Sequence, residues 1–288
     1  MLDLDTLDYD WLADRLRRRF HSRVDQWCAE LPARITDLAA RWDLDIEERI
    51  GRGRSAATFR CTGPEGAAVL KICPDASILT EEVRMLRLLL PSGRVPVVHE
   101  HDGEAALIEL IGSGVAAEDL PTPPTGAQYA AFLRDLHSVE LPERPPRRLH
   151  GWTEVLFESA KRRGADLGDS PALRDELILT QPREVLLHGD LHLGNVIDGE
   201  ERGLVAVDPI CCVGDPCFDA IDFALEGTTR EEILRRRDEL AKAYDLDRER
   251  LDAWCRVTAP IAFADASHVK PAHAAAIRAY LDTPPLRG

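Results

Sequence analysis

The chain has 288 residues, of which 44% are hydrophobic and 30% are charged, and its formal net charge is −15. This composition is typical of a globular protein with a substantial core, and the acidity argues against nonspecific binding to nucleic acid or to an anionic membrane, since both need a basic surface. The seven cysteines contain no CxxC pair, which fits reduced thiols in the cytoplasm better than a disulfide framework or a zinc site.

The N-terminal part of the chain is expected to be helical. Apolar residues recur at helical spacing over residues 9–42, and we assign this face to packing. Pro32 should begin or kink a second helical segment. The first ten residues, MLDLDTLDYD, are acidic where a signal peptide would be basic, and no apolar run approaches the roughly twenty residues that span a bilayer. We therefore expect a cytoplasmic protein that does not bind membranes.

A glycine-rich turn joins the first two predicted strands. Both strands fall within residues 46–61, and GRGRSAA at 51–57 lies between them. Glycines and small side chains let backbone N–H groups approach phosphate oxygens, which makes Gly51, Gly53 and Ser55 candidates for phosphate binding. An ordinary hairpin turn would have the same composition, so both interpretations stay open. The turn is not a P-loop, because no GK[ST] sequence opens a helix after it.

The next predicted strand, residues 67–72, places Lys71 among apolar neighbours. An ammonium group near the core needs an anion to offset its desolvation. In the helix predicted over residues 77–90, Glu82 lies roughly 70° from the centre of the apolar stripe, whereas Glu81 lies nearly opposite it. We expect Glu82 to pair with Lys71 and Glu81 to face solvent. The alternatives are an edge-strand lysine that points to water and two first-turn acids favoured by the helix dipole.

A break in the pattern predicts two lobes. A hairpin with a DG turn is expected within residues 96–110, and IGSG followed by three prolines then interrupts the secondary structure over residues 111–124. The first lobe, residues 1–111, should hold the N-terminal helices, a five-stranded sheet and the helix that carries the paired glutamate. The second lobe, residues 112–288, should hold a polar loop, a hairpin and a helical substrate region.

The polar loop is HGDLHLGN at 188–195, between two short apolar strands. The spacing of Asp190 and Asn195 suits a catalytic base beside a metal ligand. A hairpin over residues 196–208 should bring Asp208 back beside Asn195, where their side-chain oxygens can share a magnesium ion. Two turn-capping residues are the alternative.

Further polar side chains border this loop. We interpret His188 as a structural histidine, and His192 either as a contact to phosphate or substrate or as packing behind the loop. GDPCFDAID at 214–222 should begin a helix on which aspartates recur along one face. That acidic face meets either a cationic substrate or solvent, and its candidates are Asp215, Asp219, Asp222 and Glu226, with Asp265 from further along the chain.

The rest of the second lobe has a helical pattern. Helices are predicted over residues 126–137, 152–163, 171–179, 228–244, 248–269 and 271–281. The last three should form the wall of the acceptor site, with Trp254, Phe263 and His268 as candidate lining, although packing would explain each of them equally.

The order of these features is that of the parts used in protein-kinase-type phosphoryl transfer. The chain resembles the aminoglycoside phosphotransferase family, and most closely its streptomycin 6-phosphotransferase and hydroxyurea phosphotransferase branch. The resemblance covers most of the chain and rests on four stretches: HGDLHLGN at 188–195, VDP at 207–209, GDPCFD at 214–219 and WCAELPARITDLAARWDLDI at 27–46.

This resemblance implies an α+β, two-lobed protein-kinase-like fold with an antiparallel sheet and helices in the N-lobe, a mainly helical C-lobe, and ATP in the cleft. Lys71 would hold the α- and β-phosphates, oriented by Glu82, and the backbone around Glu109 to Ile111 would bind adenine. In this family an aspartate after the metal hairpin fixes the backbone of the catalytic loop. Asp215 or Asp219 would take that role here.

For catalysis the resemblance implies that Asp190 accepts the proton of the substrate hydroxyl, while Asn195 and Asp208 bind magnesium. The expected activity is phosphorylation of a hydroxyl group on a small-molecule antibiotic, a streptomycin-like aminoglycoside, by a resistance kinase. Relatives commonly carry a lysine two residues after the metal aspartate, whereas this chain has Ile210. A kinase for another antibiotic or for a biosynthetic metabolite is therefore an alternative, and a nucleotide-binding pseudokinase is a third.

The expected partners are a nucleoside triphosphate and a small hydroxyl acceptor, bound by a monomer or a weak dimer. The acidity of the chain mildly favours a cationic acceptor, although solubility alone would explain it equally well.

Overall fold

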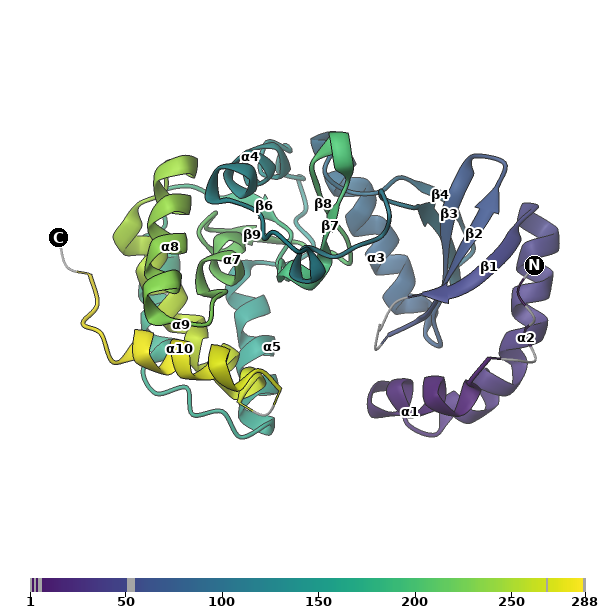
Figure 1. Ribbon diagram of the computed structural model, residues 1–288, viewed down its shortest axis with the longest axis horizontal. Coiled ribbons are helices and arrows are strands. Elements are labelled where there is room, and N and C mark those ends of the chain that lie inside the picture. The colour runs from purple at the N-terminus through teal and green to yellow at the C-terminus, as the bar shows by residue number, and fades with distance from the viewer. Residues whose placement is uncertain (1, 3, 5–6, 51–54, 268, 287–288) are drawn as a thin grey trace. The chain divides into compact units, whose positions relative to one another are not determined.

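The computed structural model describes residues 2, 4, 7–50, 55–267 and 269–286 (Figure 1). By their internal contacts the residues form two compact units. Unit 1 comprises Met1–Leu90 and Pro96–Ser113, and unit 2 comprises Pro91–Val95 and Gly114–Gly288. The predicted lobe boundary between residues 111 and 112 remains a proposal.

Unit 1 is built on a five-stranded antiparallel sheet with the strand order β1-β2-β3-β5-β4. Strand β3 lies in the middle and is buried from Ala68 to Ile72, as expected for a strand with neighbours on both sides. Helix α3 packs against β4 and β5. The strands are β1 (Asp45–Ile50), β2 (Ala57–Gly63), β3 (Gly66–Ile72), β4 (Val98–His101) and β5 (Ala105–Glu109), and the helices are α1 (Tyr9–Phe20), α2 (Arg23–Trp42) and α3 (Ala76–Leu89).

The N-terminal helices differ from the prediction at their junction. The chain stays helical through Pro32 and breaks instead at His21, whose φ is +54°. Proline removes one intrahelical hydrogen bond, but Leu31 and Ile35 on either side of Pro32 are both buried on the packed face of α2. Packing of that face therefore keeps the helix continuous where local propensity favours an interruption.

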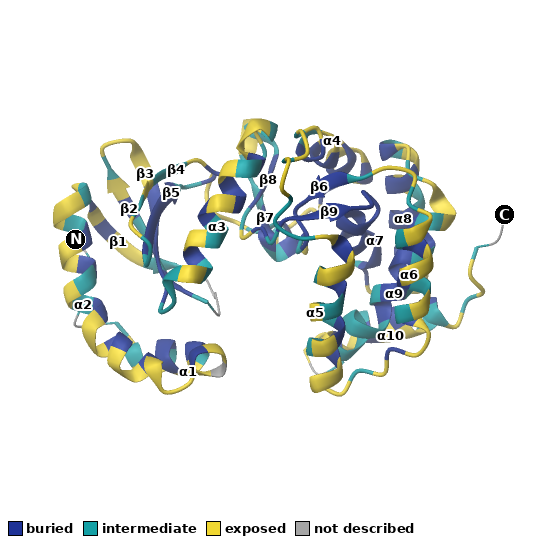
Figure 2. Ribbon diagram, turned by 180° about the vertical axis from the view of Figure 1, so that it is seen from behind, coloured by how far each residue is buried: buried dark blue, intermediate teal, exposed yellow. Residues whose placement is uncertain are grey.

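Unit 2 is mainly helical and contains two small strand pairs, β6 with β9 and β7 with β8. Figure 2 shows β6, β9 and α7 as buried elements among the surrounding helices. Helix α4 begins with a capping box in which Thr125 and Gln128 satisfy each other's backbone N–H groups. The strands are β6 (Val185–Leu187), β7 (Val196–Asp198), β8 (Leu204–Ala206) and β9 (Cys212–Gly214).

The helices of unit 2 are α4 (Gly126–Leu136), α5 (Leu149–Arg162), α6 (Ser170–Leu179), α7 (Ile221–Leu225), α8 (Arg230–Tyr244), α9 (Arg248–Ala266) and α10 (Pro271–Leu281). Short 3₁₀ helices lie at η2 (Leu90–Ser92), η3 (Ala117–Asp119), η4 (Leu193–Asn195), η5 (Glu200–Arg202) and η6 (Phe218–Ala220). Helix α4 packs on α8, and α10 packs on α8 and α9.

The cysteines are all unbridged and buried, so they serve as small core residues. Among the helices that the structure describes, none combines the length and the apolar character needed to cross a membrane.

Candidate active site

The HGDLHLGN loop follows the buried strand β6, and the side chain of Asp219 fixes its backbone. The Oδ2 atom of Asp219 accepts a hydrogen bond from the N–H of His188 at 2.7 Å, and Oδ1 accepts one from the N–H of Gly189 at 2.9 Å. Asp219 lies in η6 and is 2% exposed, so amide donors replace water around its charge. Of the two aspartates expected to hold this loop, Asp219 makes the bonds.

His188 is fully buried and connects the loop to the segment that follows β8. Its Nε2 atom lies 2.9 Å from the carbonyl oxygen of Val207, and its Nδ1 atom accepts a long, 3.4 Å hydrogen bond from the N–H of Asp190. This pattern requires the proton on Nε2, and burial lowers the pKa of the imidazole. His188 is therefore a neutral, structural histidine, as predicted.

The hairpin of β7 and β8 brings Asp208 back to Asn195, as predicted. The two strands pair in antiparallel register, and the N–H of Val207 donates to the carbonyl oxygen of Asn195 at 2.9 Å. The side-chain Nδ2 of Asn195 donates to the carbonyl oxygen of Asp190, also at 2.9 Å. That bond uses the amide nitrogen of Asn195 and not its Oδ1 atom, and Asp208 directly follows Val207 in the chain.

Asp190 is half-buried, and its pKa is raised. Burial is the main cause; His192 and His188 oppose it, while the charges of Asp208 and Asp219 add to it. A carboxylate with a raised pKa is a stronger base while it stays ionised. The raised pKa of Asp190 is thus compatible with its predicted role as a base.

A cavity of about 380 Å³ opens beside the loop within unit 2. Two basic residues at its wall are already paired: the Arg163 guanidinium lies 3.0 Å from Asp265, and the Lys270 ammonium lies 3.4 Å from Glu118. Three acidic side chains also line it, and in the described part of the chain no arginine or lysine forms an ion pair with them: Asp190, Asp222 and Glu226. The cavity therefore carries unbalanced negative charge.

Asp222 is exposed towards this cavity, with protein surrounding it on its other sides. Its pKa is raised to about 6. The low-dielectric surroundings are the largest cause; His192 opposes the shift, and the charges of Asp190, Asp219 and Glu226 add to it. Asp222 therefore titrates closer to neutrality than an ordinary aspartate does.

The prediction that the aspartates of residues 214–222 lie along one face of a single helix is wrong. Asp215 precedes η6, Asp219 lies within η6, and the separate helix α7 begins after it. The fully buried Asp215 pairs with Arg250 and accepts a hydrogen bond from Nε1 of Trp254 at 2.7 Å. Neither Asp215 nor Asp219 lines the cavity, and protein donors already use their oxygens, so nothing in the structure supports these two residues as substrate contacts.

The aromatic candidates of the C-terminal helices do not line the cavity either. Trp254 is fully buried, and Phe263 packs beneath the guanidinium of Arg278 at 4.6 Å. His268 lies outside the described residues. Helix α9 lines the cavity instead with Thr258, Asp265 and aliphatic side chains.

In unit 1 the predicted pair of Lys71 and Glu82 is present. The Nζ atom of Lys71, on β3, lies 2.6 and 2.8 Å from the two carboxylate oxygens of Glu82, on α3. The side chains are 8% and 12% exposed, so the pair is held away from bulk water. Glu81 pairs with Arg84 at the surface, at 3.0 Å. The helical periodicity thus identified the correct glutamate.

Of the other residues predicted to contact the nucleotide, the structure describes Ser55, Glu109 and Ile111. Gly51 and Gly53 lie outside the described residues. The carbonyl oxygen of Ser55 accepts a hydrogen bond from the Sγ atom of Cys73 at 3.0 Å. Glu109 is the last residue of β5, where its Oε2 atom accepts a hydrogen bond from a neighbouring backbone N–H at 3.0 Å, and Ile111 follows as a buried residue.

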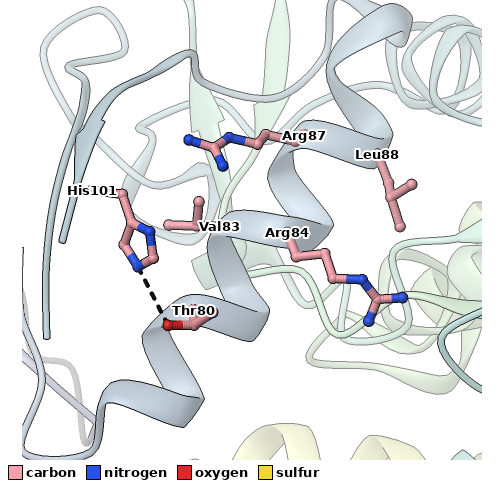
Figure 3. Close-up of a pocket in the computed structure, with 6 residues that line it drawn as sticks. All are labelled: Thr80, Val83, Arg84, Arg87, Leu88 and His101. Atoms are coloured by element: carbon pink, nitrogen blue, oxygen red, sulfur yellow. Dashed lines mark hydrogen bonds between the residues drawn. The ribbon is translucent and has the colours of Figure 1, made fainter. Parts of the chain in front are cut away.

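A second hollow of about 310 Å³ lies on unit 1, and none of the predicted site residues line it (Figure 3). Five side chains of α3 face it, and His101 of β4 closes one side, with its Nε2 atom 3.4 Å from the hydroxyl of Thr80.

Several residues that hold the HGDLHLGN loop were not identified from the sequence. The Tyr129 hydroxyl donates to the carbonyl oxygen of Leu191 at 3.1 Å, and Nε1 of Trp152 donates to that of Gly189 at 2.6 Å. His137 contacts Asp219. The sequence did offer one signal: these side chains end in a hydroxyl or a ring nitrogen although they lie in apolar helical stripes. Such a polar atom needs a hydrogen-bond partner when it is buried.

Comparison with known proteins adds independent findings. The sequence profile described as "Aminoglycoside/hydroxyurea antibiotic resistance kinase" matches residues 41–269. Hydroxyurea phosphotransferase from Kitasatospora aureofaciens is 32% identical over 242 residues, which are 78% of this chain and 69% of the relative. Streptomycin 6-kinase from Streptomyces griseus is 30% identical over 264 residues, which are 85% of this chain and 86% of the relative.

Among solved structures, a thermostable variant of the aminoglycoside phosphotransferase APH(4)-Ia, in ternary complex with ADP and hygromycin B, matches with a TM-score of 0.59. The match has 14% sequence identity and covers 86% of this chain and 96% of that one. This likeness concerns the fold, and it confirms the predicted protein-kinase-like architecture.

Proposed function

The chain belongs to the aminoglycoside/hydroxyurea antibiotic resistance kinase family, and from this we propose that it transfers the γ-phosphoryl group of ATP to a hydroxyl group of a cationic, streptomycin-like antibiotic. The observation that carries the choice of acceptor is the cavity beside the catalytic loop. It is lined by Asp190, Asp222 and Glu226, and none of them forms an ion pair with an arginine or lysine of the described chain. A cationic acceptor would balance this charge.

The nucleotide part of the proposal has two supports. A solved relative holds ADP, and the Lys71 ammonium of this chain is held by both oxygens of Glu82. A fixed ammonium can neutralise the α- and β-phosphates, while backbone groups near Ser55 and from Glu109 to Ile111 would approach the phosphates and the adenine. Gly51 and Gly53 stay proposed phosphate contacts.

Magnesium fits the donors that the loop and hairpin present. Asn195 retains its Oδ1 atom, and Asp208 supplies a carboxylate beside it. The described residues contain no cluster of three or more His, Cys, Asp or Glu suited to a metal. Mg²⁺ needs none, because it binds through one or two protein oxygens, with water and phosphate oxygens completing its shell. Bound there, it would neutralise charge on the β- and γ-phosphates.

The chemical step proposed for Asp190 is a proton transfer. The acceptor's hydroxyl oxygen attacks the γ-phosphorus, its O–H proton passes to the Asp190 carboxylate, and the bond between the γ-phosphorus and the bridging oxygen breaks to release ADP. The loop amides held by Asp219 keep Asp190 in place during this step. His192 lines the cavity beside Asp190 and is proposed to contact the acceptor or its phosphate.

The test uses purified protein with ATP, magnesium and streptomycin, and detects the phosphorylated product by mass spectrometry. Asp190→Asn should lower kcat by roughly 10²–10⁴-fold, the usual contribution of a positioned base. Asp169→Asn is the matched control, because Asp169 is exposed and makes no side-chain cap hydrogen bond. Equal turnover by wild type and Asp190→Asn would refute the mechanism, whereas no turnover of streptomycin would refute only the acceptor.

A second candidate function is phosphorylation of hydroxyurea, another antibiotic or a biosynthetic metabolite. The hydroxyurea phosphotransferase of Kitasatospora aureofaciens is as similar as the streptomycin kinase, and Ile210 supplies no charge near the loop. An acceptor panel read by ADP release distinguishes the two candidates. Turnover of uncharged acceptors alone would favour the second, and nucleotide binding without any transfer would favour a pseudokinase.

A further inference from the structure

A buried chain of hydrogen bonds leads from the catalytic loop into the helices of unit 2. The Oδ2 atom of Asp219, which accepts the N–H of His188, lies 3.0 Å from Nε2 of His137. The Nδ1 atom of His137 lies 2.7 Å from the hydroxyl of Tyr244. Two residues, Asp219 and His137, thus connect the loop backbone to Tyr244, which is distant in sequence.

The chain of bonds is shielded from water along its length. Asp219, His137 and Tyr244 are 2%, 7% and 6% exposed. Burial on its own raises the pKa of Asp219, but the hydrogen bond and the charge of His137, followed by His188 and a loop amide, outweigh it and lower the pKa below its usual value. Asp219 therefore stays ionised, and His137 contributes most to this.

Two helices that pack together fix the position of His137. His137 caps the C-terminus of α4, Tyr244 is the last residue of α8, and α4 lies against α8 (Figure 1). The guanidinium groups of Arg134 and Arg183 lie 5.9 and 5.8 Å from the Tyr244 ring, which holds that ring in turn. The imidazole is therefore oriented by tertiary packing on one side and aimed at Asp219 on the other.

We propose that His137 is a positioning residue for phosphoryl transfer, acting through Asp219 on the backbone of His188 and Gly189 and so on the placement of Asp190. The inference rests on the proposed function, in which Asp190 is the base. Asp219 needs both oxygens as acceptors, one for each loop amide. Loss of the His137 donor removes one partner of Oδ2 and favours a protonated or rotated carboxyl, which holds the His188 amide less well.

The test compares His137→Ala with His137→Gln, because a glutamine amide nitrogen can take the place of Nε2. His137→Ala should lower kcat by roughly 10–100-fold, the range typical when a residue that orients a catalytic or metal ligand is lost. KM for ATP should stay nearly unchanged, and His137→Gln should recover most of the loss. Hydrogen–deuterium exchange of the loop amides at residues 188–190 should accelerate in His137→Ala and return towards wild type in His137→Gln.

Tyr244→Phe and Tyr280→Phe form a matched pair of controls. Each removes a buried hydroxyl from unit 2, but the Tyr280 hydroxyl donates to Asp252 at 2.7 Å and not towards the loop. Tyr244→Phe should speed exchange of the loop amides, while Tyr280→Phe should not. If His137→Ala does not fold, this pair and His137→Gln decide the question.

The exchange measurement needs no acceptor, so the inference can fail separately from the proposed function. Wild-type exchange rates at residues 188–190 in both His137→Ala and Tyr244→Phe would overturn the inference. So would a loss of kcat in His137→Ala that His137→Gln does not relieve. Failure of wild type to phosphorylate any acceptor would overturn the proposed function and leave the exchange result to stand.

Discussion

At the scale of single residues, Asp222 is a carboxylate whose pKa lies closer to neutrality than that of an ordinary aspartate. Its pKa is raised to about 6 by its surroundings and by neighbouring carboxylates, from an ordinary value of 3.8. The folded chain thus binds this proton more tightly than the unfolded chain does. The resulting stabilisation is fully present below about pH 3.8 and is lost as the pH rises through about 6.

Asp222→Asn should therefore unfold at higher denaturant concentration than wild type at about pH 7.5, with the difference shrinking below about pH 4.

Ionisation of Asp222 destabilises the fold but should strengthen binding of a cationic acceptor. The KM of wild type for streptomycin should fall as the pH rises through 6, because the ionised carboxylate attracts the cation, and the variant should lose that decrease. Initial rates across this pH range measure it, with Asp169→Asn as control; identical pH profiles for wild type and Asp222→Asn would contradict it.

Single-residue predictions succeeded where local periodicity decides a direction. The pairing of Lys71 with Glu82, and not with Glu81, followed from the angle of each side chain around a helix. The same reasoning failed for Asp215 and Asp219, because residues 214–222 do not form one regular helix and the assumed periodicity does not apply.

At the scale of elements, the close approach of β9 to α5 supports the strand pair that leads into the HGDLHLGN loop. A Cβ atom added at Gly214 would lie 2.5 Å from the Cβ atom of Leu149, which sits at the start of α5 and cannot swing away as a side-chain tip could. Only glycine allows this distance. Strand β9 pairs with β6, the strand immediately before the loop.

Gly214→Ala should lower the free energy of unfolding by roughly 1–3 kcal/mol, as overpacking of a core commonly does. Gly151→Ala is the matched control in α5 itself, because nothing lies within 4 Å of its added Cβ atom. That variant should be neutral or more stable by about 0.5 kcal/mol. Urea unfolding of both variants measures the difference, and equal midpoints would show that β9 and α5 are not in rigid contact.

Element prediction was most accurate for the strands and helices with clear periodicity and least accurate where tertiary contacts decide. The strands of unit 1 and the hairpin of β7 and β8 were placed from their patterns. Strand β9 was not expected, because its three residues gain strand character only by pairing with β6. Continuity of α2 through Pro32 likewise depends on the packing of its buried face.

At the scale of the whole molecule, the net charge of −15 and the acidic cavity act in the same direction on a cationic acceptor. The KM for streptomycin should rise with ionic strength, since the Debye length falls from about 30 Å at 0.01 M salt to about 8 Å at 0.15 M. The KM for uncharged hydroxyurea, if it is a substrate, should not follow. Initial rates over a salt series measure this, and a constant KM for streptomycin would show that the acidity serves solubility alone.

By itself the sequence determined the chemistry available to this protein. The order of Lys71, Glu82, Asp190, Asn195 and Asp208 predicted the parts of kinase-type phosphoryl transfer, because motif spacing and helical angles are properties of short segments. The family and the kinase-like fold followed from the resemblance of HGDLHLGN and three other stretches to aminoglycoside phosphotransferases. Tertiary structure alone decided which acids face a cavity and which are buried beside donors. It also brought His137 and Tyr244 to Asp219. Those contacts join residues more than eighty positions apart, and only packing of whole helices against one another brings such residues together.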